Sequence, residues 1–209
     1  MIKSIIFDMD GVLIDAKEWH FEALNRAIRL FGYTISRYDH IITFDGLPTR
    51  QKLEMLTREQ GLPRSLHSLI NDLKQKYTLE LVNANCKPCF EHEYALSHLK
   101  KAGYKIALAS NSIRQTVDLM MQKAHLSHYF DVMLSNQDVM NGKPDPEVYL
   151  VAASKLGLKP SECLVVEDNQ HGIASAKAAG ANVMIVDATK DVTLSNINYN
   201  ILQIQRTIL

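Results

Sequence analysis

Two aspartates, Asp8 and Asp10, stand two residues apart at the end of a short apolar run, in the sequence F-D-M-D-G-V-L. In an extended chain, side chains two residues apart leave on the same side, so these carboxylates lie roughly 7 Å apart and can share one pocket. Gly11 follows them and lets the backbone turn sharply or approach a ligand closely. By itself this pattern fits an acidic turn as well as it fits a functional site.

Polar side chains also follow three other apolar segments of the chain. They are Ser110 with Asn111 and Ser112, Lys143 in N-G-K-P-D-P, and Glu167 with Asp168. The carboxyl ends of parallel strands meet at one edge of a sheet, so we expect these side chains to converge there. Carboxylates, a hydroxyl and a lysine are the groups that hold a hard cation together with a phosphate. The four segments therefore predict a metal-and-phosphate site.

The segments that must position these residues alternate between strand and helix patterns. Continuously apolar runs, typical of parallel strands covered on both faces, occur at 3–8, 105–110, 163–168 and 182–187, with a weaker one near 131–134. Helical patterns occur at 91–102, 112–125, 146–156 and 172–179, and three of them end at a glycine. This alternation predicts an α/β fold with a doubly wound, parallel, Rossmann-like sheet.

Residues 16–84 interrupt this rhythm, since they contain helical patterns at 17–31, 49–60 and 65–82 and no convincing strand. We therefore expect a core formed by residues 1–15 and 85–209 and an inserted all-helical cap formed by residues 16–84. The insert begins directly after the first strand, where open α/β sheets bind ligands at the carboxyl ends of their strands. A cap in that position can act as a lid over a bound substrate.

Composition narrows the classes of partner. Lys plus Arg equals Asp plus Glu, at 23 each among 209 residues, so no whole-protein field concentrates nucleic acid or an anionic membrane. The first ten residues fit neither a signal peptide nor a membrane span, which favours a cytoplasmic protein. The chain has three cysteines, and Cys86 and Cys89 form a C-x-x-C without a second pair, so packing is favoured over a zinc or redox role.

Four motifs follow one another along the chain: D-M-D-G-V-L, the Ser110 strand end, Lys143 and E-D-N-Q-H-G at 167–172. In these motifs and their order the chain resembles the haloacid dehalogenase superfamily. The resemblance covers nearly the whole chain. It is greatest to the branch with a helical cap, which includes β-phosphoglucomutase and many phosphatases of small metabolites. These motifs are specific for fold and chemistry and weak for substrate.

The resemblance implies catalytic roles for four residues. Asp8 would be the nucleophile that becomes an aspartyl-phosphate, and Asp10 the general acid and base. Lys143 and the Ser110 hydroxyl would hold the oxygens of the transferring group. Mg²⁺ would be bound by Asp8, the backbone carbonyl of Asp10, Asp168 and, as a ligand or its neighbour, Glu167.

The resemblance also implies residues that contact the substrate, and this chain departs from the family's motifs at Ala16 and Asn169. The substrate candidates are His20 and Arg50 in the cap and Asn111, Ser112 and Arg114 in the core. Lys74 and Lys76 are further cap candidates. Where the family often has Ser or Thr, this chain has Ala16, so one hydroxyl expected near the acid and base is missing. Asn169 stands where Ser is common, and His171 in the same loop is read as a surface or hydrogen-bonding residue.

The function expected from these residues is Mg²⁺-dependent hydrolysis of a small phosphomonoester, such as a sugar phosphate. One alternative is a phosphosugar mutase of the β-phosphoglucomutase type, which would share every core residue. An alternative from another class is a non-catalytic protein that binds a phosphorylated metabolite. The sequence does not name the substrate, and it gives no information on the oligomeric state.

Overall fold

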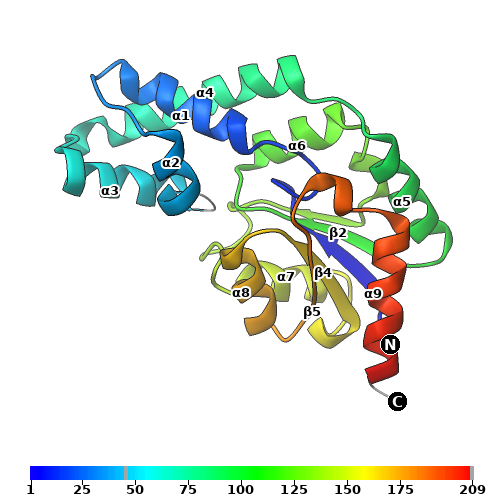
Figure 1. The fold of residues 1–209 in the computed structure, drawn as a ribbon. Helices are drawn as coiled ribbons and strands as arrows, with labels where there is room; N and C mark the ends of the chain where they lie inside the picture. Colours follow the sequence, from blue (N-terminus) through cyan, green and yellow to red (C-terminus); the bar gives the residue numbers. More distant parts are fainter. Residues whose placement is uncertain (45–46, 208–209) are drawn as a thin grey trace. The chain divides into compact units, whose positions relative to one another are not determined.

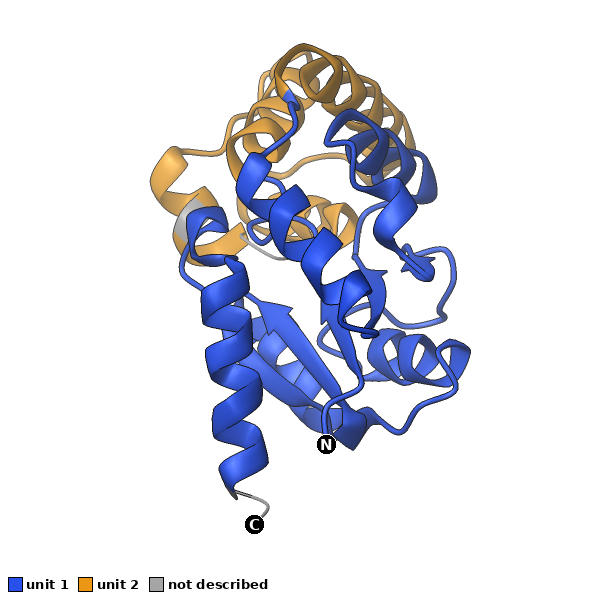
Figure 2. Ribbon diagram, turned by 90° about the vertical axis from the view of Figure 1, so that its right-hand side faces the viewer, with its two compact units in different colours: residues 1–15, 86–209 blue, residues 16–85 orange. Residues whose placement is uncertain are grey.

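The structure, a computed structural model, describes residues 1–44 and 47–207 and separates into two compact units. The first unit contains residues 1–15 and 86–209, and the second contains residues 16–85 (Figure 2). The second unit begins at Ala16 and ends at Asn85. Among the described residues, no helix has the length and apolar character needed to cross a membrane.

The first unit contains one parallel sheet of five strands, in the order β3-β2-β1-β4-β5 (Figure 1). The strands are β1 (Ser4–Phe7), β2 (Lys105–Ala109), β3 (Val132–Leu134), β4 (Cys163–Glu167) and β5 (Asn182–Ile185). Their registers place Phe7 of β1 beside Leu108 of β2 and Val166 of β4. The expected parallel α/β fold is confirmed, and β1, with the first acidic motif, lies at the centre.

Helices lie on both sides of this sheet. The helices of the first unit are α5 (Phe90–Lys101), α6 (Arg114–Lys123), α7 (Glu147–Lys155), α8 (Gln170–Ala178) and α9 (Leu194–Thr207), with short 3-10 helices at Ser127–Tyr129, Pro160–Glu162 and Thr189–Asp191. Helix α5 packs on β2 and on α9, and α7 and α8 pack on each other and on β2 to β5. Gly103, Gly157 and Gly180 follow three of these helices with positive φ angles, as their C-cap role requires.

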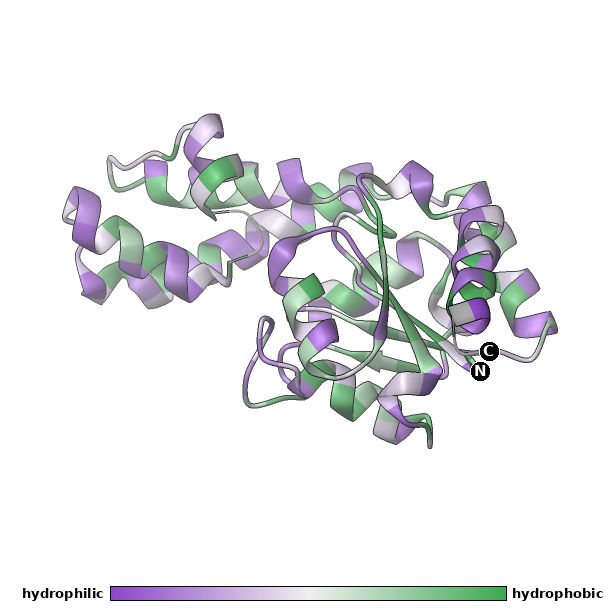
Figure 3. Cartoon of the chain, turned by 60° about the horizontal axis from the view of Figure 1, so that its bottom comes forward, coloured by the Kyte–Doolittle hydropathy of each residue, from purple (hydrophilic) through white to green (hydrophobic). Residues whose placement is uncertain are grey.

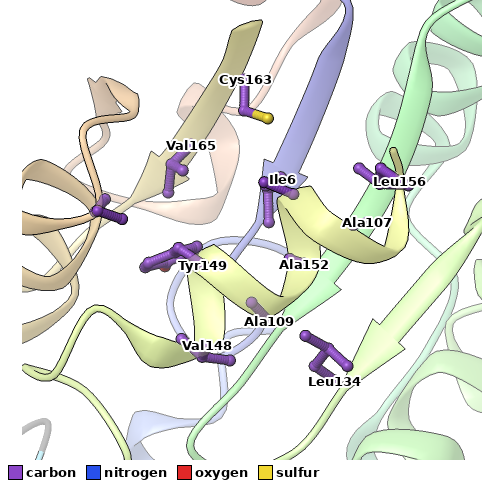
Figure 4. Packing of buried hydrophobic residues seen from close by; sticks show 13 residues of the cluster. Ile6, Ala107, Ala109, Leu134, Val148, Tyr149, Ala152, Leu156, Cys163 and Val165 are labelled. Atoms are coloured by element: carbon purple, nitrogen blue, oxygen red, sulfur yellow. The ribbon is translucent and has the colours of Figure 1, made fainter. Parts of the chain in front are cut away.

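A buried cluster holds α7 and α8 against one face of the sheet (Figure 4). Its strand residues include Ile6, Ala107 and Val165, which are neighbours in the register, and Tyr149 and Ala152 of α7 pack over them. The strands are predominantly hydrophobic along their length (Figure 3). Both faces are covered by helices, which explains why the strand sequences are continuously apolar instead of alternating.

All of the regular secondary structure among the described residues of the second unit is helical. It contains α1 (Lys17–Arg29), α2 (Arg37–Asp39), a π-helical turn (His40–Phe44), α3 (Thr49–Gln60), a 3-10 turn (Arg64–Leu66) and α4 (His67–Asn85). Helices α1 and α4 pack together, and the unit has its own apolar core that includes Leu24, Ile28 and Leu56. Asn25 is fully buried there, and its amide pairs with the backbone N–H and carbonyl of Ile35.

Candidate active site

The backbone ladder of the sheet continues into the loops that carry the acidic and polar side chains. The N–H of Asp8 donates to the Val166 carbonyl at 3.0 Å, one residue beyond the end of β1. The N–H of Ser110 donates to the Leu134 carbonyl at 3.0 Å, one residue beyond β2. These bonds fix the first residue of each loop, so Asp8, Ser110 and Glu167 start from the same edge of the sheet.

The ammonium group of Lys143 joins these strand ends. Its Nζ donates to Asp8 Oδ1 at 2.6 Å, to Glu167 Oε1 at 2.7 Å and to the Ala109 carbonyl at 2.8 Å. All three donor positions of the ammonium are therefore in use. The side chains of Lys143, Asp8 and Glu167 are almost completely buried.

The electrostatics of this group follow from burial and pairing. Burial lowers the pKa of Lys143, but Asp8 and Glu167 outweigh it and raise that pKa above its ordinary value, so the ammonium keeps its proton. Burial raises the pKa of Asp8 well above its ordinary value, and Lys143 offsets only part of that shift. A buried carboxylate of this kind needs positive charge close by to remain ionised.

Glu167 is held by more than Lys143. Its Oε1 accepts a 2.5 Å hydrogen bond from the Tyr149 hydroxyl of α7, and its Oε2 accepts one from the Asp168 N–H at 3.1 Å. The Lys143 ammonium also lies 4.9 Å from the centre of the Tyr149 ring. Gly172 lies directly against the Glu167 carboxylate, since a Cβ at that position would lie 1.8 Å from Glu167 Oε1. The carboxylate therefore has very little room to move.

A group of three acids at this edge could hold a cation. Carboxylate oxygens of Asp8, Glu167 and Asp168 lie within 4.8 Å of one another. An all-oxygen set with one partly exposed member, Asp168, suits Mg²⁺, which prefers oxygen ligands and keeps several waters. These three side chains fit the expected metal, and the fourth expected ligand, the backbone carbonyl of Asp10, stays a prediction.

The loop after β2 connects Ser110 to Asp10. The Ser112 N–H donates to Ser110 Oγ at 3.0 Å, so the Ser110 hydroxyl accepts this bond and its own proton points elsewhere. The Ser112 hydroxyl donates to Asp10 Oδ2 at 2.9 Å. A hydroxyl beside Asp10, which Ala16 cannot supply, is thus supplied from the loop after the neighbouring strand.

Asn111 binds the backbone of the lysine loop through its side chain. Its Oδ1 accepts from the Lys143 N–H at 3.0 Å, and its Nδ2 donates to the Lys143 carbonyl at 3.3 Å. Gly142 is adjacent, and a Cβ there would lie 2.9 Å from Asn111 Oδ1. The Asn111 amide therefore positions Lys143, and the expectation that Asn111 contacts substrate stays a prediction.

The other expected substrate residues have varied surroundings. The Arg114 guanidinium pairs with Asp138 and donates to the Met133 carbonyl at 3.0 Å, so its groups are already engaged within the core. In the second unit, Arg50 is exposed near the start of α3, and His20 Nδ1 lies 3.4 Å from Lys74 Nζ. Substrate contact by Arg50, His20 or Arg114 stays a prediction.

The remaining sequence features have structural roles. Asn169 is the N-cap of α8, where its side chain accepts from the Gly172 N–H at 3.0 Å, as Ser would. His171 has a partly exposed side chain on α8 and does not belong to the acidic group formed by described residues. Cys86 and Cys89 are unbridged thiols, and burial raises the pKa of both.

Tyr149 and Gly172 were not expected to contribute to the site. Tyr149 occurs six residues after Lys143, in the helix that begins after K-P-D-P, and it reads as an ordinary core aromatic. Gly172 ends the E-D-N-Q-H-G motif, and a glycine inside a helix is a signal of close packing. The only sequence signals that could have identified Tyr149 and Gly172 are their positions relative to K-P-D-P and within E-D-N-Q-H-G.

The fold and the site together define a class: an α/β protein whose acids, lysine and hydroxyls gather at the carboxyl edge of a parallel sheet. The chain matches the haloacid dehalogenase-like hydrolases over residues 5–186 and belongs to that family of enzymes. This confirms the resemblance seen in the motifs.

Individual relatives cover most of the chain. A phosphorylated carbohydrates phosphatase of Thermotoga maritima is 34% identical over 86% of this chain and 82% of its own length. A pyrophosphatase, PpaX, of Bacillus cereus is 31% identical over 90% of this chain and 84% of its own. A β-phosphoglucomutase structure from Clostridium difficile has a TM-score of 0.84 at 22% identity, covering 97% of this chain and 98% of that one, a likeness of fold alone.

Proposed function

We propose that this enzyme is a Mg²⁺-dependent phosphatase that hydrolyses a small phosphomonoester of the sugar phosphate class through an aspartyl-phosphate on Asp8. The observation that carries the proposal is the Lys143 ammonium, which is bonded to both Asp8 and Glu167 inside a group of three carboxylates. An isolated cluster of buried acids would be unstable, so the arrangement is suited to a second cation and an anionic substrate.

The proposed reaction has two displacements at phosphorus. In the first, an oxygen of Asp8 forms a bond to phosphorus, the bond to the ester oxygen breaks, and Asp10 gives its proton to that leaving oxygen. In the second, Asp10 takes a proton from water, the water oxygen forms a bond to phosphorus, and the bond between the Asp8 oxygen and phosphorus breaks, which frees Asp8 and inorganic phosphate. Ser110 is suited to bind an equatorial oxygen in both steps, and Lys143 would do so by exchanging one of its three hydrogen bonds for a phosphate oxygen.

Asp8, Glu167 and Asp168 would hold the Mg²⁺ ion. When bound, the ion supplies charge neutralisation between an anionic nucleophile and an anionic phosphate. Asp8 and Asp10 need different environments, because an aspartate of ordinary pKa is only about 0.1% protonated at pH 7. The contacts differ as this requires: Asp8 is bonded to the Lys143 ammonium, and Asp10 is bonded to the neutral Ser112 hydroxyl.

Hydrolysis is favoured over mutase activity by the relatives. The Thermotoga and Bacillus proteins, both above 30% identity, carry the names of a phosphatase and a pyrophosphatase, whereas the mutase likeness is one of fold. A mutase must also hold a bisphosphate at both ends. Arg114, one candidate for that second grip, is paired with Asp138.

The test is phosphate release from a panel of sugar phosphates, other small phosphate esters and pyrophosphate, with Mg²⁺ present. We expect at least one ester to be hydrolysed by the wild type, and Asp8→Asn to lose essentially all turnover while keeping its circular dichroism spectrum. The control is Asp72→Asn, an exposed aspartate of α4. Substantial phosphate release by Asp8→Asn would contradict the assigned nucleophile.

A second measurement separates hydrolase from mutase. The enzyme is incubated with β-glucose 1-phosphate, Mg²⁺ and a trace of glucose 1,6-bisphosphate, and both glucose 6-phosphate and inorganic phosphate are followed. We expect ester hydrolysis to outpace formation of glucose 6-phosphate. Formation of glucose 6-phosphate at roughly tens per second or faster, within the usual range for evolved enzymes, without ester hydrolysis would replace the phosphatase proposal by the mutase. Binding of phosphometabolites without turnover of any of them would favour a non-catalytic protein.

A further inference from the structure

The hydroxyl of Ser112 contacts Asp10, the proposed acid and base of the reaction. Ser112 and Asp10 lie in the loops after the adjacent strands β2 and β1, and the Ser112 Oγ donates to Asp10 Oδ2 at 2.9 Å. We propose that Ser112 is a positioning residue, which holds the Asp10 carboxyl group in the orientation from which its protonated form gives the proton to the leaving oxygen. This inference rests on the proposed phosphatase function and deepens it.

Ser112 presents its hydroxyl from a fixed backbone. Its N–H donates to Ser110 Oγ at 3.0 Å, and its carbonyl accepts from the Asn136 N–H at 3.0 Å. Both bonds use main-chain atoms of Ser112, so they persist when the side chain is changed. Removal of the hydroxyl therefore deletes one hydrogen bond to Asp10 and leaves the loop in place.

Asp10 also has a constrained backbone. The Gly11 N–H donates to the Ile14 carbonyl at 2.7 Å, and the Met9 carbonyl accepts from the N–H groups of Leu13 and Ile14. Gly11 has a φ of 89°, a value that favours glycine in this turn. With the backbone fixed on both sides, the side-chain torsions of Asp10 decide where its carboxylate points. A hydrogen bond from a neutral donor to a carboxylate is among the stronger ones, so it can select one torsion.

The donor count of a serine makes this role distinct from phosphate binding. A hydroxyl has one proton to donate, and in this structure Ser112 donates it to Asp10. A contact with a substrate phosphate would need that same proton. We therefore assign Ser112 to Asp10, whereas the motif resemblance had placed it among the substrate-contact candidates.

The effect of a misplaced Asp10 on the rate depends on the leaving group of the substrate. When the phosphorus–oxygen bond of an alkyl phosphate breaks, the departing alkoxide is strongly basic and must receive the proton of Asp10 as the Asp8–phosphorus bond forms. The departing group of 4-nitrophenyl phosphate is a weakly basic phenolate that leaves without a proton. Misplacement of Asp10 should therefore slow the first ester and spare the second.

The experiment compares kcat/KM for two substrates: the alkyl phosphate that the wild type hydrolyses fastest in the panel and 4-nitrophenyl phosphate. For Ser112→Ala we expect kcat/KM to fall about tenfold on the alkyl ester, a fraction of the full value of acid–base catalysis, and less than about threefold on the aryl ester. Ser112→Thr keeps a hydroxyl and should recover most of the loss. Ser161→Ala, a serine change in the 3-10 turn before β4, is the matched control.

A double-variant cycle tests whether Ser112 acts through Asp10. Residues that act as one unit have non-additive effects, so Ser112→Ala should change kcat/KM on the alkyl ester less than twofold, or about 0.4 kcal/mol, when Asp10 is already Asn. Equal losses on both esters, with a raised KM, would assign Ser112 to phosphate binding and overturn the inference. An unchanged ratio of the two kcat/KM values would overturn it as well. Failure of the wild type to hydrolyse any ester would instead remove the proposed function.

Discussion

At the scale of single residues, the site depends on contacts that stabilise a buried charge. Glu167 is completely buried, and it would be an isolated anion without the Lys143 ammonium, the Tyr149 hydroxyl and the Asp168 N–H. Removal of one partner from a buried charged group costs more than the hydrogen bond itself, because the group cannot be resolvated. Tyr149 is therefore as much a part of this arrangement as the charged residues are.

We predict that Tyr149→Phe lowers the free energy of unfolding by roughly 1.5–3 kcal/mol, the range for hydrogen bonds to charged groups. The change keeps the ring beside Lys143 and removes only the hydroxyl, so packing is preserved. Urea denaturation followed by circular dichroism measures it. Tyr199→Phe, an exposed tyrosine of α9, is the control and should be neutral. Equal stability of the two variants would show that the Tyr149 hydroxyl adds nothing to Glu167.

At the scale of elements, helix α8 and strand β4 approach so closely at the site that only glycine fits between them. Gly172 lies in the first turn of α8, and the carboxylate of Glu167 fills the space beside it. Helix propensity alone would make alanine better than glycine by about 1 kcal/mol at this position. The clash with a buried carboxylate acts in the opposite direction.

We predict that Gly172→Ala destabilises the enzyme and removes most of its activity, because a Cβ 1.8 Å from Glu167 Oε1 forces the carboxylate or the helix to move. Thermal unfolding and phosphate release are the measurements. Lys177→Ala, on the exposed side of the same helix, gains helix propensity without a clash and should behave as the wild type. A Gly172→Ala variant as stable and active as Lys177→Ala would contradict this packing.

Asp131, which precedes β3, forms hydrogen bonds to β2 and α5 outside the site. Its Oδ2 accepts from the Ile106 N–H of β2 at 2.8 Å, and its Oδ1 accepts from Lys100 Nζ of α5 at 2.6 Å. Burial raises the pKa of Asp131, but these two donors outweigh burial and hold that pKa below its usual value. A carboxyl whose pKa is lower in the folded state stabilises the fold above its unfolded pKa of about 3.9.

We predict that Asp131→Asn lowers the free energy of unfolding at neutral pH and that this difference shrinks as the pH falls below about 4, towards the folded pKa of Asp131. The sign follows from proton uptake: the unfolded state binds the proton first as the pH falls. Urea denaturation over a pH series measures the difference, and Lys100→Met, which removes one of the two donors, should show a smaller effect of the same sign. A difference that grows in acid would contradict the assignment.

At the scale of the whole molecule, formal neutrality means that no overall charge attracts a cation. The chain has 23 basic and 23 acidic side chains, so we assign the proposed affinity for Mg²⁺ to the local set Asp8, Glu167 and Asp168. A ligand that binds only the folded state raises its stability in proportion to the logarithm of its concentration. Metal binding can therefore be read from stability as well as from turnover.

We predict that excess chelator abolishes phosphate release and that Mg²⁺ restores it. Mg²⁺ should also raise the melting temperature of the wild type, because the folded state alone assembles the three carboxylates. Asp168→Asn should show a much smaller rise, while Asp72→Asn should respond as the wild type. Full activity in chelator, together with a melting temperature that Mg²⁺ does not change, would rule out the metal site.

The sequence by itself determined the parallel α/β fold and the edge at which the acids, hydroxyls and lysine gather. It could do so because apolar periodicity and glycine caps are local, and parallel strands end at a common edge whatever their side chains. It missed α9, whose asparagines lower helix propensity, although the burial of Ile197 and Ile201 gives the helix an apolar side.

Only the tertiary structure decided which side chains pair at that edge. Three hydrogen bonds join residues of different elements. They run from Tyr149 to Glu167, from the Lys143 backbone to the Asn111 side chain, and from Ser112 to Asp10. Such contacts depend on how far each loop carries its side chain after the strand ends, and sequence spacing does not report that distance. Local patterns therefore place the residues at the edge, whereas long-range packing sets the partner of each one.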